Sequence, residues 1–333
     1  MNLHRLSCFA LLAAIGFANA AAAETRADEI LDRFKNRDAT QRNVMVVAHR
    51  GAAFREGQEV VAENSIASLN RAVDLGVDMV EIDVRRTKDG VYVVSHDETL
   101  DRATNCTGSV EDMAFAEMSD CRLLSGPNRD VTDEAVPTLA YFLKNAKGRI
   151  MINLDNKVGA ENLPGIYQVV EAEGMTPYVV TTIAANSAED LAAVNGVMAD
   201  LPQGVQLMPN VRDDRISGLD HLEMIYGTFP FEVMQGRDTY AGGELTSDGG
   251  VLFNADAQAL AQKHDVHLWV NTLSFPDQPD MRSGGRGDAR AVATGDLDSV
   301  YGFWAGQGVT MIQTDEPELA INYLEEKGYR QPY

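Results

Sequence analysis

The sequence predicts a closed (β/α)8 barrel in which β-strands and α-helices alternate. Short runs of β-branched residues alternate with amphipathic stretches through most of the 333 residues. Several of these runs are almost continuously apolar, as expected for parallel strands that are buried on both faces. Because the strand–helix unit repeats many times without a dividing linker, a single barrel over residues 24–333 is favoured over an open sheet or two domains.

The alternation can be followed along the chain from element to element. The expected strands are residues 44–48, 79–84, 91–95, 150–154, 178–182, 205–208, 224–228, 266–270 and 309–313. Helical periodicity is clearest in residues 65–75, 163–173, 188–199 and 255–263. The expected N-caps of two of these helices are Asn64 or Ser65 and Asn186 or Ser187. Two glycine-rich segments, 241–250 and 276–295, are expected to form surface loops, and the second follows a strand end, where it could cover a site.

The second and third expected strands are joined by a hairpin. Residues 85–90 are too few for the crossover that parallel strands need, and they contain an Asp-Gly pair, which is typical of a tight turn. If Arg86 pairs with Val91, then Glu81 lies opposite His96. Since directly opposed residues share one face of a sheet, His96 is expected beside the carboxylate of Glu81.

Reactive side chains gather where the predicted strands end, which is where barrel enzymes keep their chemistry. Glu81 and Asp83 are two residues apart on one strand and therefore face the same side, and Asp155 ends another strand. These three carboxylates offer only oxygen ligands, which favours one Ca²⁺ or Mg²⁺ ion over zinc. A divalent cation would also remove the repulsion among three buried acids.

Two histidines and two cations accompany these acids at the strand ends. His49 and His96 can serve as general acid and general base, because imidazole titrates near working pH. Arg50 and Lys157 supply positive charge where a transferring phosphoryl group would need it. The combination predicts a site for phosphoryl chemistry.

The N-terminus has the features of a secretory signal peptide. A short basic start, residues 1–5, precedes an apolar run, residues 6–17, and small residues lead to an expected cleavage after Ala23. The run is too short to serve as a membrane anchor. We therefore expect residues 1–23 to be removed and the mature protein to be periplasmic or secreted.

Charge and cysteine content agree with an exported protein. The net charge of −22 disfavours nucleic acid and anionic membranes as partners. Cys106 and Cys121 are 15 positions apart in an acidic, loop-like segment, and in an oxidising compartment such a pair predicts a disulfide. Oligomeric state leaves no signature in the sequence.

The motifs of residues 49–157 together resemble the glycerophosphodiester phosphodiesterase family. The matching pieces are His49-Arg50-Gly51, Glu63-Asn64-Ser65, Glu81-Ile82-Asp83-Val84, Thr87-Lys88-Asp89-Gly90, the run from His96 to Arg102, Val136-Pro137-Thr138-Leu139 and Asn153-Leu154-Asp155-Asn156-Lys157. Beyond residue 178 the resemblance thins to pieces such as Trp269 with Asn271 and Gln313-Thr314-Asp315.

The resemblance implies a barrel whose Glu81, Asp83 and Asp155 hold a metal and whose His49 and His96 form the acid–base pair. It further implies phosphate contacts from Arg50 and Lys157, a substrate contact from Trp269, and hydrolysis of glycerophosphodiesters to an alcohol and glycerol 3-phosphate. Asp155 stands where the family usually has Glu, which shortens the reach of that ligand.

Two other functions are compatible with these residues. A phospholipase or sphingomyelinase D-like enzyme could place a similar set of histidines and acids in a similar barrel, although no apolar or basic docking stretch for lipid is visible. A barrel that binds phosphodiesters without turning them over would not need both histidines and all three acids to be present.

Overall fold

Eight parallel strands close into a barrel in the computed structural model, which describes residues 24–37, 43–239, 242–273 and 283–333. The barrel strands are β1 (Met45–Ala48), β4 (Met79–Arg86), β8 (Met151–Asn156), β9 (Val179–Ala184), β10 (Gln206–Arg212), β11 (Val233–Arg237), β12 (His267–Asn271) and β13 (Met311–Thr314). Each pairs in parallel with its neighbour, and β1 closes the ring by pairing with both β13 and β4. The predicted (β/α)8 barrel is confirmed.

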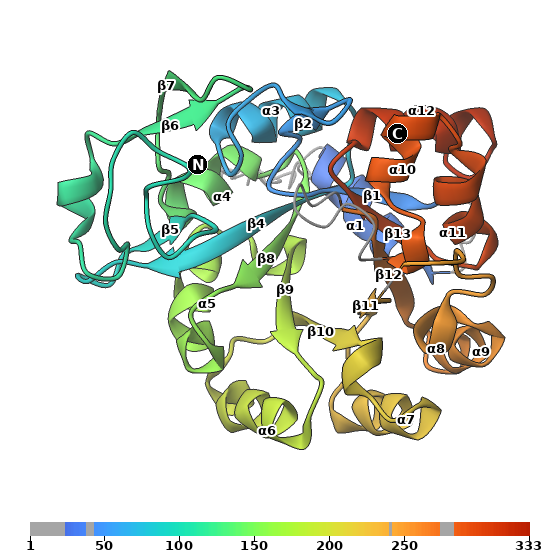
Figure 1. Ribbon diagram of the computed structural model, residues 1–333. Coiled ribbons are helices and arrows are strands. Elements are labelled where there is room, and N and C mark those ends of the chain that lie inside the picture. Colours follow the sequence, from blue (N-terminus) through green and yellow to red (C-terminus); the bar gives the residue numbers. More distant parts are fainter. Residues whose placement is uncertain (1–23, 38–42, 240–241, 274–282) are drawn as a thin grey trace, which may run out of the picture.

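Helices surround the barrel on its outside, except the first, which lies across the amino end of the barrel (Figure 1). They are α1 (Arg26–Lys35), α3 (Ile66–Asp74), α4 (Leu139–Ala146), α5 (Leu163–Ala172), α6 (Ala188–Val197), α7 (Leu219–Thr228), α8 (Gly250–Phe253), α9 (Ala255–Lys263), α10 (Asp288–Thr294), α11 (Phe303–Gly306) and α12 (Pro317–Glu326). Ser65 and Ser187 cap α3 and α6 by accepting backbone N–H bonds, as predicted. Apolar side chains of strands and helices form one continuous core between them.

The sixth barrel strand lies later in the chain than predicted. Residues 224–228, expected as a strand, belong to α7, and the strand is β11. The apolar run 224–228 resembles a strand because Ile225 and Tyr226, which are adjacent in sequence, both belong to the buried side of a helix. The strand β11 was missed because it ends in Gln235-Gly236-Arg237, which interrupts the apolar signal.

The hairpin after β4 is present, but its register differs from the prediction by one residue. Arg86 pairs with Tyr92 of β5 (Tyr92–Val94), an antiparallel strand outside the barrel ring. The turn is longer than expected because the Thr87 hydroxyl accepts the Val91 N–H at 3.0 Å and so holds Val91 inside the turn. His96 is therefore not opposite Glu81 on the ladder, and it lies two residues beyond the end of β5.

Residues that follow β5 form an insertion on one side of the barrel, next to α3 and α4 (Figure 1). It contains the antiparallel pair β6 (Arg122–Ser125) and β7 (Asp130–Ala135). A smaller pair, β2 (Phe54–Arg55) and β3 (Gln58–Glu59), follows β1. The insertion has a small apolar cluster of its own that includes Leu100, Val110 and Leu123.

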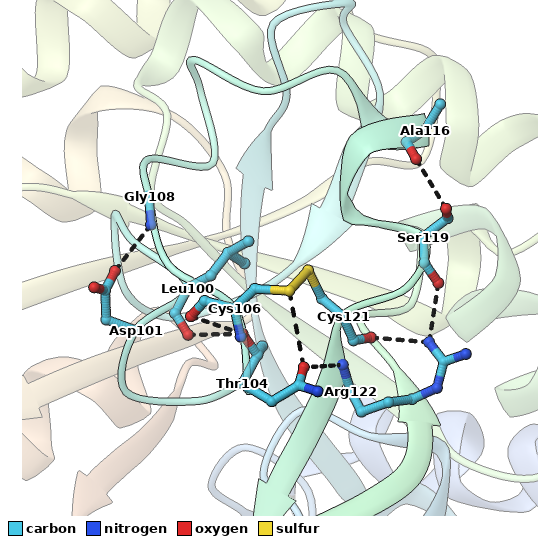
Figure 2. The surroundings of a disulfide bond; sticks show 10 residues. Leu100, Asp101, Thr104, Cys106, Gly108, Ala116, Ser119, Cys121 and Arg122 are labelled. Carbon is cyan, nitrogen blue, oxygen red and sulfur yellow. Dashed lines mark hydrogen bonds between the residues drawn. A yellow bond between two sulfur atoms is a disulfide. The ribbon is translucent and has the colours of Figure 1, made fainter.

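A disulfide joins Cys106 to Cys121 within this insertion, as predicted, and Figure 2 shows its surroundings. The Thr104 hydroxyl accepts the Cys106 N–H at 3.0 Å and also donates to the carbonyl of Leu100 at 2.9 Å. Cys121 is buried in the apolar cluster. The bond therefore ties the segment that follows His96 to the segment that leads into β6.

The expected signal peptide, residues 1–23, lies outside the described residues, as do parts of both glycine-rich segments. The remainder of the second segment is not only loop, since it contains α10. Among the described helices, none has the length and apolar character needed to cross a membrane.

Removing the disulfide should destabilise the protein. Replacing both Cys106 and Cys121 by Ser should lower the free energy of unfolding by about 3 kcal/mol, the chain-entropy cost for a loop of this length. Urea unfolding would measure the change. Reducing agent should lower the stability of the wild type to a similar extent and leave the double variant unaffected; equal stability of oxidised wild type and variant would refute the prediction.

Candidate active site

The reactive residues predicted at strand ends converge on one pocket at the carboxyl end of the barrel. His49 and Arg50 directly follow β1, and Glu81 and Asp83 point inward from β4. Seven of the eight residues predicted for the site line this pocket: His49, Arg50, Glu81, Asp83, His96, Asp155 and Lys157. The eighth, Trp269, does not line it.

Glu81, Asp83 and Asp155 form an acidic triad at the centre of the pocket. Asp83 on β4 is the register partner of Asp155 on β8, which places their side chains next to one another. Oxygen atoms of the three carboxylates lie within 4.8 Å of one another, and no other described group of three potential ligands is as close. Two oxygens on opposite sides of a Ca²⁺ ion lie about 4.6–5.2 Å apart, so this donor set fits a hard divalent cation.

The triad carries a high electrostatic cost. Burial, followed by the charges of Asp83 and Asp155, raises the pKa of Glu81 well above its usual range. Burial also acts to raise the pKa of Asp83, but Lys157 and Arg50 outweigh it and lower that pKa. Lys157 Nζ lies 2.6 Å from Asp155 and 3.1 Å from Asp83, so its positive charge partly compensates the negative charge of the three carboxylates.

Backbone geometry at Arg50 supports the triad. Arg50 adopts a left-handed conformation, with a φ of 50°, and its N–H donates to Glu81 Oε2 at 3.0 Å. Gly51 also has a positive φ, and a Cβ there would lie 2.2 Å from the Ser68 hydroxyl, so only glycine fits. Such strain is retained at functional sites because the surrounding structure enforces it.

His49 is held by a carboxylate whose role no local sequence motif predicts. Its Nδ1 lies 2.7 Å from Oδ1 of Asp315, which follows β13. Asp315 in turn donates its backbone N–H to Asp288 at 2.8 Å. With Nδ1 donating to the carboxylate, Nε2 is left facing Glu81, 4.0 Å away, in the pocket.

A chain of charged groups connects His96 to Arg50. His96 Nδ1 lies 2.6 Å from Asp97, and Arg102 bonds both Asp97 and Glu63. Glu63 in turn accepts from Arg50 at 3.1–3.2 Å. The family motifs contain Asp97, Arg102 and Glu63, but their partners became visible only in the folded chain. Each histidine is thus oriented by a carboxylate of its own.

The floor of the pocket consists of amide side chains and a threonine in place of the aliphatic residues usual in barrels. They come from five strands and are Asn153, Thr182, Gln235, Asn271 and Gln313. Trp269, fully buried below them, donates its Nε1–H to Asn271 at 2.9 Å. Trp269 therefore orients a floor residue instead of facing the cavity, which differs from the substrate contact expected of it.

Sequence reasoning missed a third cation in the pocket. Arg237 ends β11 and lines the pocket from the side opposite β4 in the ring of strands. It was overlooked because the sixth strand was placed at residues 224–228. The apolar pair Val233-Met234 is a short signal of this strand, which the polar residues Gln235 and Arg237 then interrupt.

Comparison with known proteins gives two family matches. Residues 49–183 match the glycerophosphoryl diester phosphodiesterase family, and residues 247–324 match a domain of unknown function. A glycerophosphodiester phosphodiesterase from Caldanaerobacter subterraneus subsp. tengcongensis is 37% identical over 123 residues, which are 37% of this chain and 49% of the relative. The chain spans about half the length of the first curated relatives that it matches.

Solved structures resemble the whole barrel. A glycerophosphodiester phosphodiesterase from Agrobacterium tumefaciens superposes with a TM-score of 0.59 at 22% identity, covering 83% of this chain and 99% of its own. A phosphodiesterase from Oleispira antarctica, solved with the product sn-glycerol-3-phosphate, gives a TM-score of 0.57 at 17% identity over 84% of this chain and 96% of its own. At these identities the structures establish the shared fold. The match to the glycerophosphoryl diester phosphodiesterase family covers residues 49–183, which contain the triad and both histidines.

Proposed function

We propose that this protein is a metal-dependent phosphodiesterase that hydrolyses glycerophosphodiesters to an alcohol and glycerol 3-phosphate. The observation that carries the proposal is the placement of two carboxylate-bound histidines, His49 and His96, around one acidic triad. The family match and the product bound to the Oleispira antarctica phosphodiesterase support glycerophosphodiesters as the substrate class.

Glu81, Asp83 and Asp155 would hold one Ca²⁺ or Mg²⁺ ion, which when bound supplies charge stabilisation for the phosphate oxygens. Arg50 and Lys157 lie beside the triad, where they would bind the same phosphate. One of the two histidines accepts a proton from the attacking oxygen, which belongs to water or, in a first step through a cyclic phosphate, to the glycerol hydroxyl. The other donates a proton to the alcohol as its bond to phosphorus breaks.

Export of the protein is part of this proposal. Residues 1–23 would direct it to the periplasm or the cell exterior and leave residues 24–333 as the mature domain. The Cys106–Cys121 disulfide supports an oxidising location. Deacylated lipid headgroups are small phosphodiesters of the kind that the polar pocket could admit.

Incubating the mature protein with a panel of glycerophosphodiesters should release glycerol 3-phosphate in the presence of Ca²⁺ or Mg²⁺ and not in chelator. His49→Ala and His96→Ala should each lower kcat by roughly 10²- to 10⁴-fold. His264→Ala is a matched control because that histidine is exposed and does not line the pocket. Activity in chelator would argue against the metal, and a lack of release from any diester would direct the search to intact lipids.

Substituting Asp315 tests the support of His49. Asp315→Asn keeps the size of the side chain but offers a neutral amide to Nδ1, so the ring can take the wrong tautomer or orientation. We expect kcat to fall roughly 10²-fold or more, with metal affinity unchanged. Steady-state kinetics and calorimetric metal titration would separate these effects, and a near-normal kcat would contradict the role of Asp315.

At a pH where the Glu81 carboxyl would ionise, Glu81→Gln should stabilise the metal-free protein by about 1–3 kcal/mol, because it removes one buried like charge while keeping an acceptor for the Arg50 N–H. The raised pKa of Glu81 means that the folded wild type retains a proton that the unfolded chain releases, so wild-type stability falls as the pH rises through that window. The advantage of the variant should therefore grow with pH.

Urea unfolding with and without Ca²⁺ would measure this effect. Added Ca²⁺ should stabilise the wild type and have little effect on Glu81→Gln. Glu161→Gln, which removes an exposed carboxylate after β8, should behave as the wild type. Equal stabilisation of Glu81→Gln and wild type by Ca²⁺ would exclude Glu81 as a ligand.

A further inference from the structure

Arg237 is a half-buried cation at the end of β11, and the charges of Asp155 and Glu81 only partly offset the burial that lowers its pKa. Its side chain lines the pocket, and its Nε is inaccessible to solvent and makes no hydrogen bond. No carboxylate of the described residues forms an ion pair with it. Arginine remains charged in proteins, and a buried charge without a partner is costly. The energetic cost of keeping Arg237 in the pocket therefore points to an anion that binds there.

Packing of β11 explains why Arg237 faces the pocket and why the adjacent carboxylate, Asp238, does not neutralise it. A Cβ on Gly236 would lie 2.5 Å from the Phe253 ring, so the outer face of β11 at this position is packed against α8. Side chains alternate along a strand, which turns Gln235 and Arg237 inward and Asp238 outward. Asp238 faces Gly250 and Gly284 on the outside, and burial raises its pKa to about 8.

The other two cations of the pocket are already bound by carboxylates. Arg50 is bound by Glu63, and Lys157 by Asp155 and Asp83. Both belong to the side of the pocket formed by β1, β4 and β8. Arg237 stands across the ring on β11, above the amide floor residue Gln235. The charge of Arg237 is therefore available for a second anionic group, distinct from the phosphate next to the triad.

We propose that Arg237 determines substrate specificity by binding an anionic group, a carboxylate or phosphate, carried by the alcohol half of the diester. The inference rests on the proposed function and deepens it, because it names the substrate class: glycerophosphodiesters whose alcohol is negatively charged. A guanidinium recognises such oxyanions through paired N–H donors. Diesters with a cationic alcohol such as choline would be disfavoured by the same charge.

The test compares diesters of glycerol 3-phosphate that differ only in the charge of the alcohol. Glycolate provides a carboxylate, and glycolamide provides its uncharged counterpart. The wild type should bind the glycolate diester more tightly, and Arg237→Gln should lose that preference by roughly 10- to 100-fold, the affinity supplied by one charge-assisted contact. Arg237→Lys should retain part of it.

Arg212→Gln is the matched control. Arg212 is the register partner of Arg237 on β10, but it is bound by Asp214 and does not line the pocket, so its removal should leave the preference unchanged. Equal weakening of both diesters by Arg237→Gln would assign Arg237 to the reacting phosphate and overturn the proposal. An unchanged preference in Arg237→Gln would overturn it as well.

Binding and turnover are measured separately so that the two proposals can fail independently. Calorimetric titration in the His96→Ala background reports the preference without hydrolysis, and glycerol 3-phosphate release from otherwise wild-type protein reports activity. Absence of release from every diester would refute the proposed function while the calorimetric preference still tests Arg237. Release of glycerol 3-phosphate without any preference for the glycolate diester would refute the role of Arg237 alone.

Discussion

Crowding of three carboxylates in the mouth of the barrel is the constraint on which the rest of the site depends. Glu81, Asp83 and Asp155 are brought together by the parallel register of β4 and β8, and burial makes their mutual repulsion expensive. Lys157 lies against two of them, and the strained backbone of Arg50 donates to the third. Aliphatic side chains, which are usual inside barrels, would avoid this repulsion, and in the proposed function a bound cation relieves it.

Two independent networks position the histidines around this centre. His49 depends on Asp315, which is anchored through Asp288 at the start of α10. His96 depends on Asp97, and the charged chain that continues through Arg102 connects the insertion to the barrel. The insertion that the disulfide cross-links is therefore also the segment that supplies one of the two histidines.

The far side of the pocket differs in character from the side that holds the triad. Amides from several strands form its floor, and Trp269 braces one of them from below. Arg237 adds a single positive charge without a carboxylate partner in the described chain. Under the proposed function, this division gives the pocket one side for a metal and a phosphate and another side that recognises the remainder of the substrate.

The sequence by itself determined the barrel, the acidic triad and both histidines. These features are encoded by residues that lie close together in the chain, where apolar periodicity and local motifs can be recognised. It also determined the Cys106–Cys121 pair. Only the tertiary structure decided the partners of the histidines, since Asp315 lies 266 positions from His49 and no local pattern couples them. It also corrected the hairpin register, which depends on one side-chain hydrogen bond, and revealed β11 with Arg237, whose polar end faces the pocket and so breaks the apolar pattern that marks a strand.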